Sequence, residues 1–203
     1  MSFDIAQVYA HFRETGASEQ QKLGWRDSET QQRNFKVMLD TLEDLKIPLQ
    51  GLSVHDAGCG HGDLLVELEK RGGVRDYFGT DAMQAALDIA RQRFPSRDFR
   101  QQNLQDAYSI PEADVTLVFG TFAFYKPREV EGMLHDLWKH SKVALGFTTW
   151  WNLDPTFVDH ERAEQLQKCI NRFLRTVNGM QALALLPGES YGEPTEAMFI
   201  LWR

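Results

Sequence analysis

The sequence predicts an α/β protein with an open, mostly parallel sheet and helices on both faces. Three observations support this class. Apolar strand-like segments alternate with amphipathic helix-like segments along residues 52–175. A glycine-rich turn at residues 58–62 joins the first strand to its helix. The last two apolar segments, 182–186 and 197–202, have no helix between them, so they must pair as a hairpin and give the sheet one antiparallel strand.

Length and charge limit the function. A chain of 203 residues is long enough for one domain with a sizeable core. Its net charge of −7 disfavours a nucleic-acid partner, because phosphate binding needs a basic surface. Arg91, Arg93, Arg97 and Arg100 cluster in the sequence and could form a local basic patch, but we expect them to be the solvated end of a helix.

Cysteine content and hydropathy predict a cytoplasmic protein that does not cross a membrane. Cys59 and Cys169 provide no disulfide framework, as is typical of a reducing cytosol. No apolar run is long enough to span a bilayer, and residues 1–4 lack a charged-then-apolar signal. No Cys/His cluster has metal-ligand spacing, so no metal site is expected.

The first fifty residues are expected to be helical. Residues 4–14 could form a short helix, and residues 15–18 break it. A longer helix should begin at a cap on Asp27 or Ser28 and run to about Leu45, because apolar residues recur at helical spacing in this range.

The first strand, residues 52–57, leads into a turn with glycine at alternate positions, Gly58, Gly60 and Gly62. Glycine tolerates positive φ and lets a ligand approach the backbone, and the following helix directs its free N–H groups at the turn. Dinucleotide sites need G-x-G-x-x-G, whose third glycine would fall on Asp63. A carboxylate there would lie badly beside a pyrophosphate, which opposes a nicotinamide oxidoreductase. A plain strand-to-helix connection is the simpler alternative.

Four further strands alternate with helices after the turn. The strands are expected at residues 77–81, 99–104, 114–120 and 142–148, and the helices at 82–94, 127–138 and 159–175. The run at 114–120 is almost unbroken in its apolar character, which is typical of the middle of a parallel sheet. Trp150 and Trp151 fall in the loop after the fifth strand. They either line a substrate pocket, which we favour, or pack beneath the next helix.

The stretch Val54-His55-Asp56-Ala57-Gly58-Cys59-Gly60-His61-Gly62 resembles the first motif of the class I S-adenosylmethionine-dependent methyltransferases. It departs from that motif at His55, where an aliphatic residue is usual. The resemblance extends from about residue 50 to the closing hairpin. It implies a Rossmann-like, doubly wound sheet of seven strands with an antiparallel last strand. It also implies a helical lid at residues 1–50 and a cofactor-binding domain at 51–203, together one compact domain.

The resemblance implies S-adenosylmethionine as the cofactor, with its methionine part on the glycine turn and its ribose hydroxyls on Asp81. For Asp81 a helix cap is the alternative, and both roles can hold. The residues that we expect to bind the cofactor are Trp25, Arg33, Asp56, Gly58, Cys59, Gly60, Gly62, Asp81, Ala82, Met83, Asn103, Leu104, Phe119 and Gly120.

Several of these residues have alternative roles. Ala82 and Met83 should line the adenine side, where Asn103 takes the position of the acid usual in the family and could contact the adenine amino group. A simple turn residue is the alternative for Asn103. Arg33 either pairs with the cofactor carboxylate or lies on the helix surface. Trp25 is favoured as a packing residue over a pocket wall.

The implied reaction is methyl transfer to an oxygen or nitrogen of a small-molecule acceptor. A general base is needed only where the acceptor must lose a proton, and Tyr125, Asp154 and His160 are the candidates near the expected pocket. None has a partner visible in the sequence, so the catalytic residue stays unassigned. An RNA or protein methyltransferase, or a cofactor-binding protein without catalysis, is the alternative function.

Overall fold

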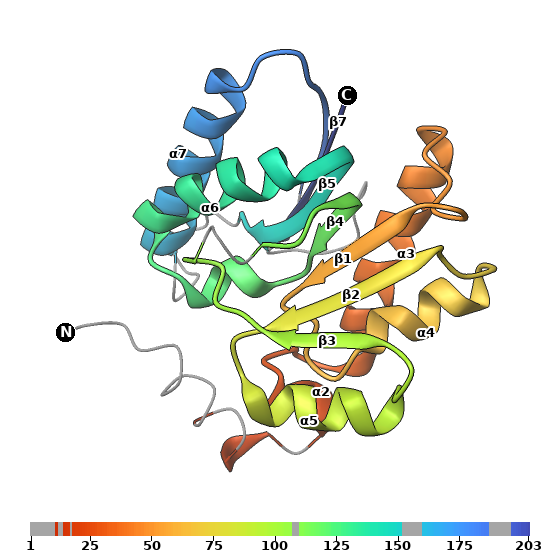
Figure 1. Cartoon of the computed structure of the whole chain (residues 1–203). Coiled ribbons are helices and arrows are strands. Elements are labelled where there is room, and N and C mark those ends of the chain that lie inside the picture. The colour runs from red at the N-terminus through yellow and green to blue at the C-terminus, as the bar shows by residue number, and fades with distance from the viewer. Residues whose placement is uncertain (1–10, 12–13, 17, 107–109, 152–159, 187–195) are drawn as a thin grey trace.

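The computed structural model describes residues 11, 14–16, 18–106, 110–151, 160–186 and 196–203 (Figure 1). Within these residues seven strands form one sheet in the order β3-β2-β1-β4-β5-β7-β6. The strands are β1 Ser53–Ala57, β2 Asp76–Asp81, β3 Asp98–Gln101, β4 Ala113–Val118, β5 Ser141–Trp150, β6 Gln181–Leu185 and β7 Glu196–Trp202. Strands β1 to β5 pair in parallel, and β7 pairs antiparallel with both β5 and β6. The predicted Rossmann-like sheet with an antiparallel last strand is confirmed.

Helices cover both faces of this sheet (Figure 1). They are α2 Glu19–Lys22, α3 Ser28–Asp44, α4 Asp63–Lys70, α5 Gln84–Arg93, α6 Pro127–His140 and α7 His160–Thr176, with a 3-10 helix, η2, at Thr121–Phe124. The side chains of α3, α4 and α5 share one buried core with Val54 and Val115. Those of α6 and α7 share a second core with Ala57 and Val118, which point to the opposite face because alternate strand residues do so.

Local sequence signals explain where the front helices begin. The Asp27 carboxylate caps α3 by accepting the N–H of Thr30 at 2.7 Å, so the predicted cap at this position is present. The short helix α2 was not expected from the sequence. It begins with a capping box, in which Ser18 and Gln21 exchange hydrogen bonds between their side chains and backbones.

Three parts of the structure differ from the expected elements or fall outside the comparison. Strand β5 continues to Trp150, where a loop was predicted, because β7 pairs with it from Ala144 to Trp150. Strand β3 ends at Gln101, three residues before its expected end. Most of the helix predicted at 4–14 lies outside the described residues.

His55 is fully buried in the middle of the sheet. Its Nε2 lies 2.8 Å from the Thr80 hydroxyl, while its Nδ1 has no hydrogen-bond partner in the described part of the chain. Burial lowers the pKa of His55 to about 3, with a smaller contribution from His140. His55 therefore stays neutral. An uncharged ring thus occupies the position where the family motif usually has an aliphatic residue.

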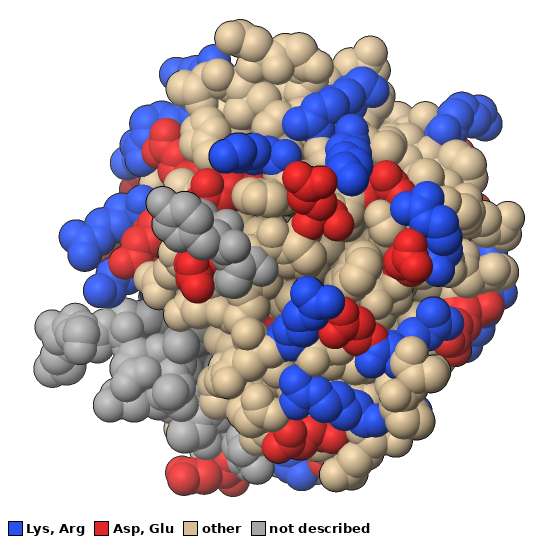
Figure 2. All heavy atoms as spheres, in the orientation of Figure 1, with Lys and Arg blue, Asp and Glu red and all other residues tan. Residues whose placement is uncertain are grey.

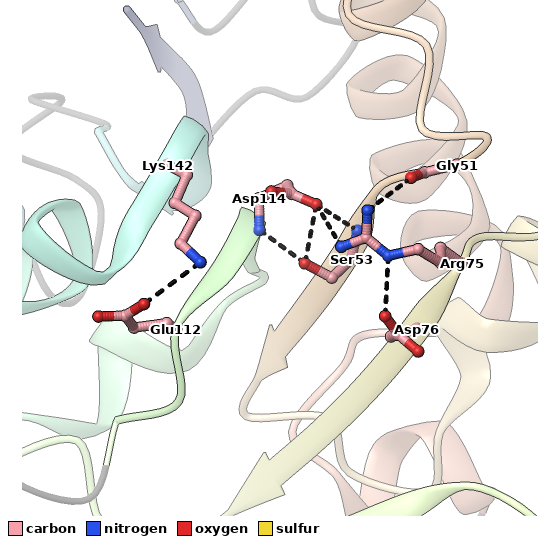
Figure 3. Close-up of polar contacts among 7 residues, drawn as sticks. All are labelled: Gly51, Ser53, Arg75, Asp76, Glu112, Asp114 and Lys142. Carbon is pink, nitrogen blue, oxygen red and sulfur yellow. Dashed lines mark hydrogen bonds and ion pairs between the residues drawn. The ribbon is translucent and has the colours of Figure 1, made fainter.

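The amino ends of the strands, opposite the glycine turn, are joined by a polar cluster around Asp114 (Figure 3). Its Oδ2 accepts the backbone N–H of Ser53 at 2.8 Å, the Ser53 hydroxyl at 3.0 Å and Nη2 of Arg75 at 2.9 Å. The backbone N–H of Ser53 is the main reason that the pKa of Asp114 is lowered. These contacts fix β1 against β4.

Charges of both signs are interleaved on the face drawn in Figure 2. The arginines that cluster in the sequence are each paired with an acid: Arg91 with Asp88, Arg93 with Asp63, Arg97 with Glu69 and Arg100 with Asp98. Arg91 and Arg93 lie at the end of α5, as expected, whereas Arg97 follows the helix and Arg100 lies on β3.

Candidate functional site

A cavity of about 310 Å³ opens at the carboxyl ends of β1 and β4, next to the point where the strand order reverses. Open α/β sheets bind their ligands at this position. Segments from the whole chain contribute to it. The lining residues are Leu23, Gly24, Trp25, Gln31, Phe35, Asp56, Gly58, Cys59, Gly60, Phe119, Gly120, Thr121, Ala123, Phe124, Trp150, Arg162 and Glu196.

The glycine turn forms the floor of this cavity. Gly58, Gly60 and Gly62 all have positive φ, at 85°, 54° and 77°. A side chain at Gly58 would also place its Cβ 2.1 Å from Oγ1 of Thr121. Gly58 therefore satisfies two requirements at once, a left-handed backbone and close packing against the loop after β4.

Gly62 and Asp63 have structural contacts next to the cavity. A Cβ at Gly62 would lie 3.2 Å from the ring of Phe94, and Gly62 is not among the lining residues. Asp63 accepts hydrogen bonds from Arg93 at 2.6 Å and from Nε2 of Gln31 at 3.2 Å. The carboxylate in the third glycine position of a dinucleotide motif thus joins α4 to α5 and α3.

Asp56 lies at the end of β1 and lines the cavity with only 3% of its surface exposed. Its Oδ2 accepts the hydroxyl of Tyr77 at 2.7 Å. Burial raises the pKa of Asp56 to about 7; the hydrogen bond from Tyr77 opposes this, and the charges of Asp81 and Asp63 add to it.

Asp81, the last residue of β2, is held by backbone N–H groups at both carboxylate oxygens. Oδ2 accepts Gly60 N–H at 2.9 Å, and Oδ1 accepts Met83 N–H at 2.8 Å. Burial raises its pKa, and these backbone bonds oppose the rise. Asp81 therefore supports the glycine turn and the start of α5. It also lines a second, narrow cavity with Ala82 and Leu104.

Gln102 lies in the wall of the same narrow cavity and was missed by the sequence analysis. It is buried, and neither its Oε1 nor its Nε2 has a hydrogen-bond partner among the described residues. The neighbouring Asn103 instead accepts the N–H of Gln105 at 3.0 Å and the Tyr125 hydroxyl at 3.2 Å. Asn103 lines neither cavity and has the geometry of the simple turn residue considered as its alternative.

The front segment contributes Trp25 and Gln31 to the main cavity. Trp25 also packs edge-on against Phe35, with 6.1 Å between ring centroids, so it is both a packing residue and a wall. Arg33 is not among the lining residues. Met83 faces a separate cavity of about 240 Å³ that it shares with His61 and α2.

The wall of the cavity also includes residues of η2, β5, α7 and β7. Arg162 donates from Nη2 to the carbonyl of Ala123 at 2.6 Å and also to that of Tyr125, so α7 is joined to η2 here. Trp150 lines the cavity, whereas Trp151 packs against Phe199 with ring centroids 5.0 Å apart. Trp150 therefore lies in the cavity wall, while Trp151 packs against β7.

Tyr125 is one of the three candidates for a general base. It is buried beside the narrow cavity, its hydroxyl is bound to Asn103, and burial raises its pKa to about 12. Asp154 and the side chain of His160 lie outside the described residues. Glu196, which the sequence analysis did not consider, is a carboxylate in the wall of the main cavity.

Among the described residues, no group of three or more His, Cys, Asp or Glu side chains is arranged to hold a metal ion. None of the helices formed by these residues is both long and apolar enough to cross a membrane.

Comparison with known sequences gives a match to the family model of a methyltransferase domain over residues 54–143. The chain is 28% identical over 147 residues to magnesium-protoporphyrin O-methyltransferase of Rhodobacter capsulatus, which covers 61% of this chain and 63% of the relative. It is 34% identical over 87 residues to carboxy-S-adenosyl-L-methionine synthase of Wolinella succinogenes, covering 40% and 36%. The matches therefore span less than two thirds of either relative.

Solved structures show the same fold. Magnesium protoporphyrin IX methyltransferase from Synechocystis PCC 6803 with bound S-adenosylhomocysteine has a TM-score of 0.71 at 17% identity, with 98% of this chain and 100% of that chain covered. The N-methyltransferase NodS from Bradyrhizobium japonicum WM9, also with S-adenosylhomocysteine, has a TM-score of 0.69 at 11% identity, with 98% of each chain covered.

The glycine motif, the strand order and the matched domain agree with one another. The matched domain and the fold support the resemblance of this chain to the class I S-adenosylmethionine-dependent methyltransferases.

Proposed function

We propose that this protein transfers the methyl group of S-adenosylmethionine to an oxygen or nitrogen of a small molecule. One observation carries the proposal. The glycine turn and Asp56 share a single cavity with a second wall, formed by Phe124, Trp150 and Arg162, that the cofactor motif does not require. A cavity of about 310 Å³ with an additional aromatic wall suits a small acceptor.

The residues present fit the cofactor. Its ammonium group has a carboxylate partner in Asp56, and Gly58 and Gly60 leave room for its methionine part. Asp81, fixed by backbone N–H groups, can accept the ribose hydroxyls. The amide of Gln102, buried and without partners in the described chain, offers one donor and one acceptor to the edge of adenine.

When bound, the cofactor supplies a methyl group already activated by the positive charge of its sulfonium. The contribution of the chain is then mainly to position the reactants and to exclude water. Gly120, at φ 66°, donates its N–H to the Thr148 hydroxyl at 2.9 Å, which fixes the backbone between β4 and η2. Phe119 packs there against Phe35 of α3, with ring centroids 4.8 Å apart.

We further propose that residues 1–50 form a lid over the cofactor domain at 51–203. The proposal is supported by Leu23, Trp25 and Gln31, which lie in the cavity wall. A small-molecule acceptor rather than nucleic acid is supported by the pairing of each clustered arginine with an acid. A cytoplasmic location is supported by Cys59 and Cys169, which are both buried and free.

Calorimetric titration with S-adenosylhomocysteine, with NADH in a parallel experiment, tests the cofactor. We expect micromolar binding of the former alone. Asp81→Asn should weaken it by about tenfold or more, because the variant loses a charged acceptor for the ribose. The matched control is Asp76→Asn at the opposite end of the same strand, which should bind as the wild type does. Binding of NADH alone would overturn the assignment.

Transfer of label from methyl-labelled S-adenosylmethionine tests the reaction. Incubation with a cell extract should label the small-molecule fraction. Label that precipitates with RNA or protein would contradict the small acceptor. Protein that binds S-adenosylhomocysteine but labels neither fraction would contradict catalysis.

A further inference from the structure

Three carboxylates surround the glycine turn, and each has a different kind of partner. Asp63 is paired with Arg93 at 2.6 Å. Asp81 accepts two backbone N–H groups, from Gly60 and Met83. Asp56 accepts a neutral phenol from Tyr77, and within the described residues no cation forms an ion pair with it. Asp56 is thus the carboxylate of the three whose charge is least compensated by the protein itself.

Tyr77 is placed so that it fixes the direction of the Asp56 carboxylate. It lies on β2, beside β1, and is only 3% exposed. Its ring packs edge-on against Phe99, with 5.8 Å between centroids. Because the Tyr77 hydroxyl holds Oδ2 at 2.7 Å, Oδ1 is left for whatever enters the cavity that Asp56 lines.

Arg162, the cation in the wall of the same cavity, donates to the carbonyls of Ala123 and Tyr125, and the other groups that face Asp56 supply no positive charge. They are Tyr77 and Asp81 from β2, Cys59 from the turn, Asp63 from α4, and Gln31 and Phe35 of α3 across the same cavity. Burial raises the pKa of both Cys59 and Tyr77, so these two stay neutral. Burial likewise raises the pKa of Asp56 to about 7, so near neutral pH the carboxyl holds a proton in part of the molecules. A cationic ligand would favour the ionised form.

We propose, building on the function proposed above, that Tyr77 is a positioning residue that directs Asp56 at the ammonium group of the cofactor, and that cofactor binding releases a proton from Asp56 to solvent. The O–H bond of the carboxyl breaks, the proton passes to the buffer, and the carboxylate left behind pairs with the ammonium. Binding at this end of the cavity is therefore linked to pH.

Calorimetry measures the released proton directly, without turnover. S-adenosylhomocysteine is titrated into the protein in phosphate and in imidazole, whose ionisation enthalpies differ, at pH 6, 7 and 8. We expect about half a proton released per cofactor at pH 7, close to one at pH 6, and little at pH 8. Affinity should rise over the same range.

Three variants test which side chain releases the proton. Asp56→Asn, which is isosteric, should release none and should bind with a weak, pH-independent affinity. Tyr77→Phe keeps the ring but removes the donor, so it should move the midpoint of release to higher pH and weaken binding about tenfold at pH 7. His61→Gln is the matched control, because His61 is a histidine of the glycine turn and its pKa is lowered by burial. It should release the proton as the wild type does.

The outcomes separate the two proposals. Failure of S-adenosylhomocysteine to bind at any pH overturns the proposed function. Binding whose enthalpy is the same in both buffers leaves the cofactor assignment intact and overturns the proton release. A Tyr77→Phe variant with the wild-type midpoint and affinity shows that Tyr77 only packs. Loss of the proton in His61→Gln assigns it to His61 instead of Asp56.

Discussion

Gln102 and Asn103 are neighbours in the sequence, yet the folded chain gives their amide groups different surroundings. Asn103 turns back on Gln105 and Tyr125, while Gln102 points into the narrow cavity beside Asp81. The resemblance to the family indicated Asn103, near the end of a third strand that was expected to reach residue 104. The strand ends at Gln101, and a shift of one position after a strand moves a side chain to the other side of the backbone.

Replacement of Gln102 tests whether its amide recognises adenine. Gln102→Leu keeps the volume and removes both polar atoms, so binding of S-adenosylhomocysteine should weaken by about tenfold, the equivalent of one or two hydrogen bonds. Asn103→Ala is the comparison and should weaken binding less. Equal losses in the two variants, measured by calorimetry, would contradict the assignment.

The buried His55 should make the free energy of unfolding of the protein depend on pH. Burial holds its pKa at about 3 in the folded state, below the ordinary value of 6.5, so between these values the unfolded chain binds more protons. The contribution of His55 therefore favours folding above pH 6.5 and is lost as the pH falls toward 3.

His55→Leu should remove this dependence. Relative to the wild type, its free energy of unfolding should rise by about 1.4 kcal/mol for each pH unit below 6.5. Urea unfolding at pH 7, 6 and 5 measures the difference, and His135→Gln, at an exposed histidine of α6, should stay constant. A difference that does not change with pH would show that His55 is protonated in the folded protein.

Some helices and strands begin and end where their own residues predict. The apolar stripe of α3 and its Asp27 cap were visible in the sequence, and the helix begins and ends where they indicate. Strand β5 is different. Its extension to Trp150 exists because β7 supplies hydrogen-bonding partners from a segment nearly fifty residues later, the pair being Trp150 with Glu196.

The hydrogen bonds of Asp114 should stabilise the pairing of β1 and β4 at their amino ends. Asp114→Asn keeps the shape but loses the charge that three donors share, so we expect a loss of about 1–3 kcal/mol in the free energy of unfolding. Asp76→Asn removes only a half-exposed ion pair with Arg75 and should cost about 0.5 kcal/mol or less. Denaturant midpoints compare them; equal effects would mean that Asp114 is merely a surface charge.

At the scale of the whole molecule, the main cavity joins segments that the sequence keeps far apart. Its wall combines Trp25 before α3, the turn after β1, η2 after β4 and Arg162 of α7. A ligand that contacts several of these segments binds only the folded chain, so it should stabilise all of them together.

S-adenosylhomocysteine should therefore raise the thermal midpoint. At a hundred times its dissociation constant the stabilisation is about 2.7 kcal/mol, which corresponds to a shift of roughly 5–10 °C for a chain of this size. Differential scanning fluorimetry measures the shift, and the Asp81→Asn variant at the same concentration should show a smaller one. No shift with the wild type at saturation would contradict binding to the folded state.

The sequence by itself determined the sheet, the glycine turn and the resemblance to a methyltransferase family. These depend on local properties: apolar periodicity, the freedom of glycine at positive φ, and an acid at the end of the second strand. Only the tertiary structure decided which side chains line the cavity. It chose Gln31 over Arg33 and Gln102 over Asn103, and it divided Trp150 from Trp151 between pocket and core. The direction of a side chain depends on where each element ends and what packs against it, and those partners come from distant parts of the chain.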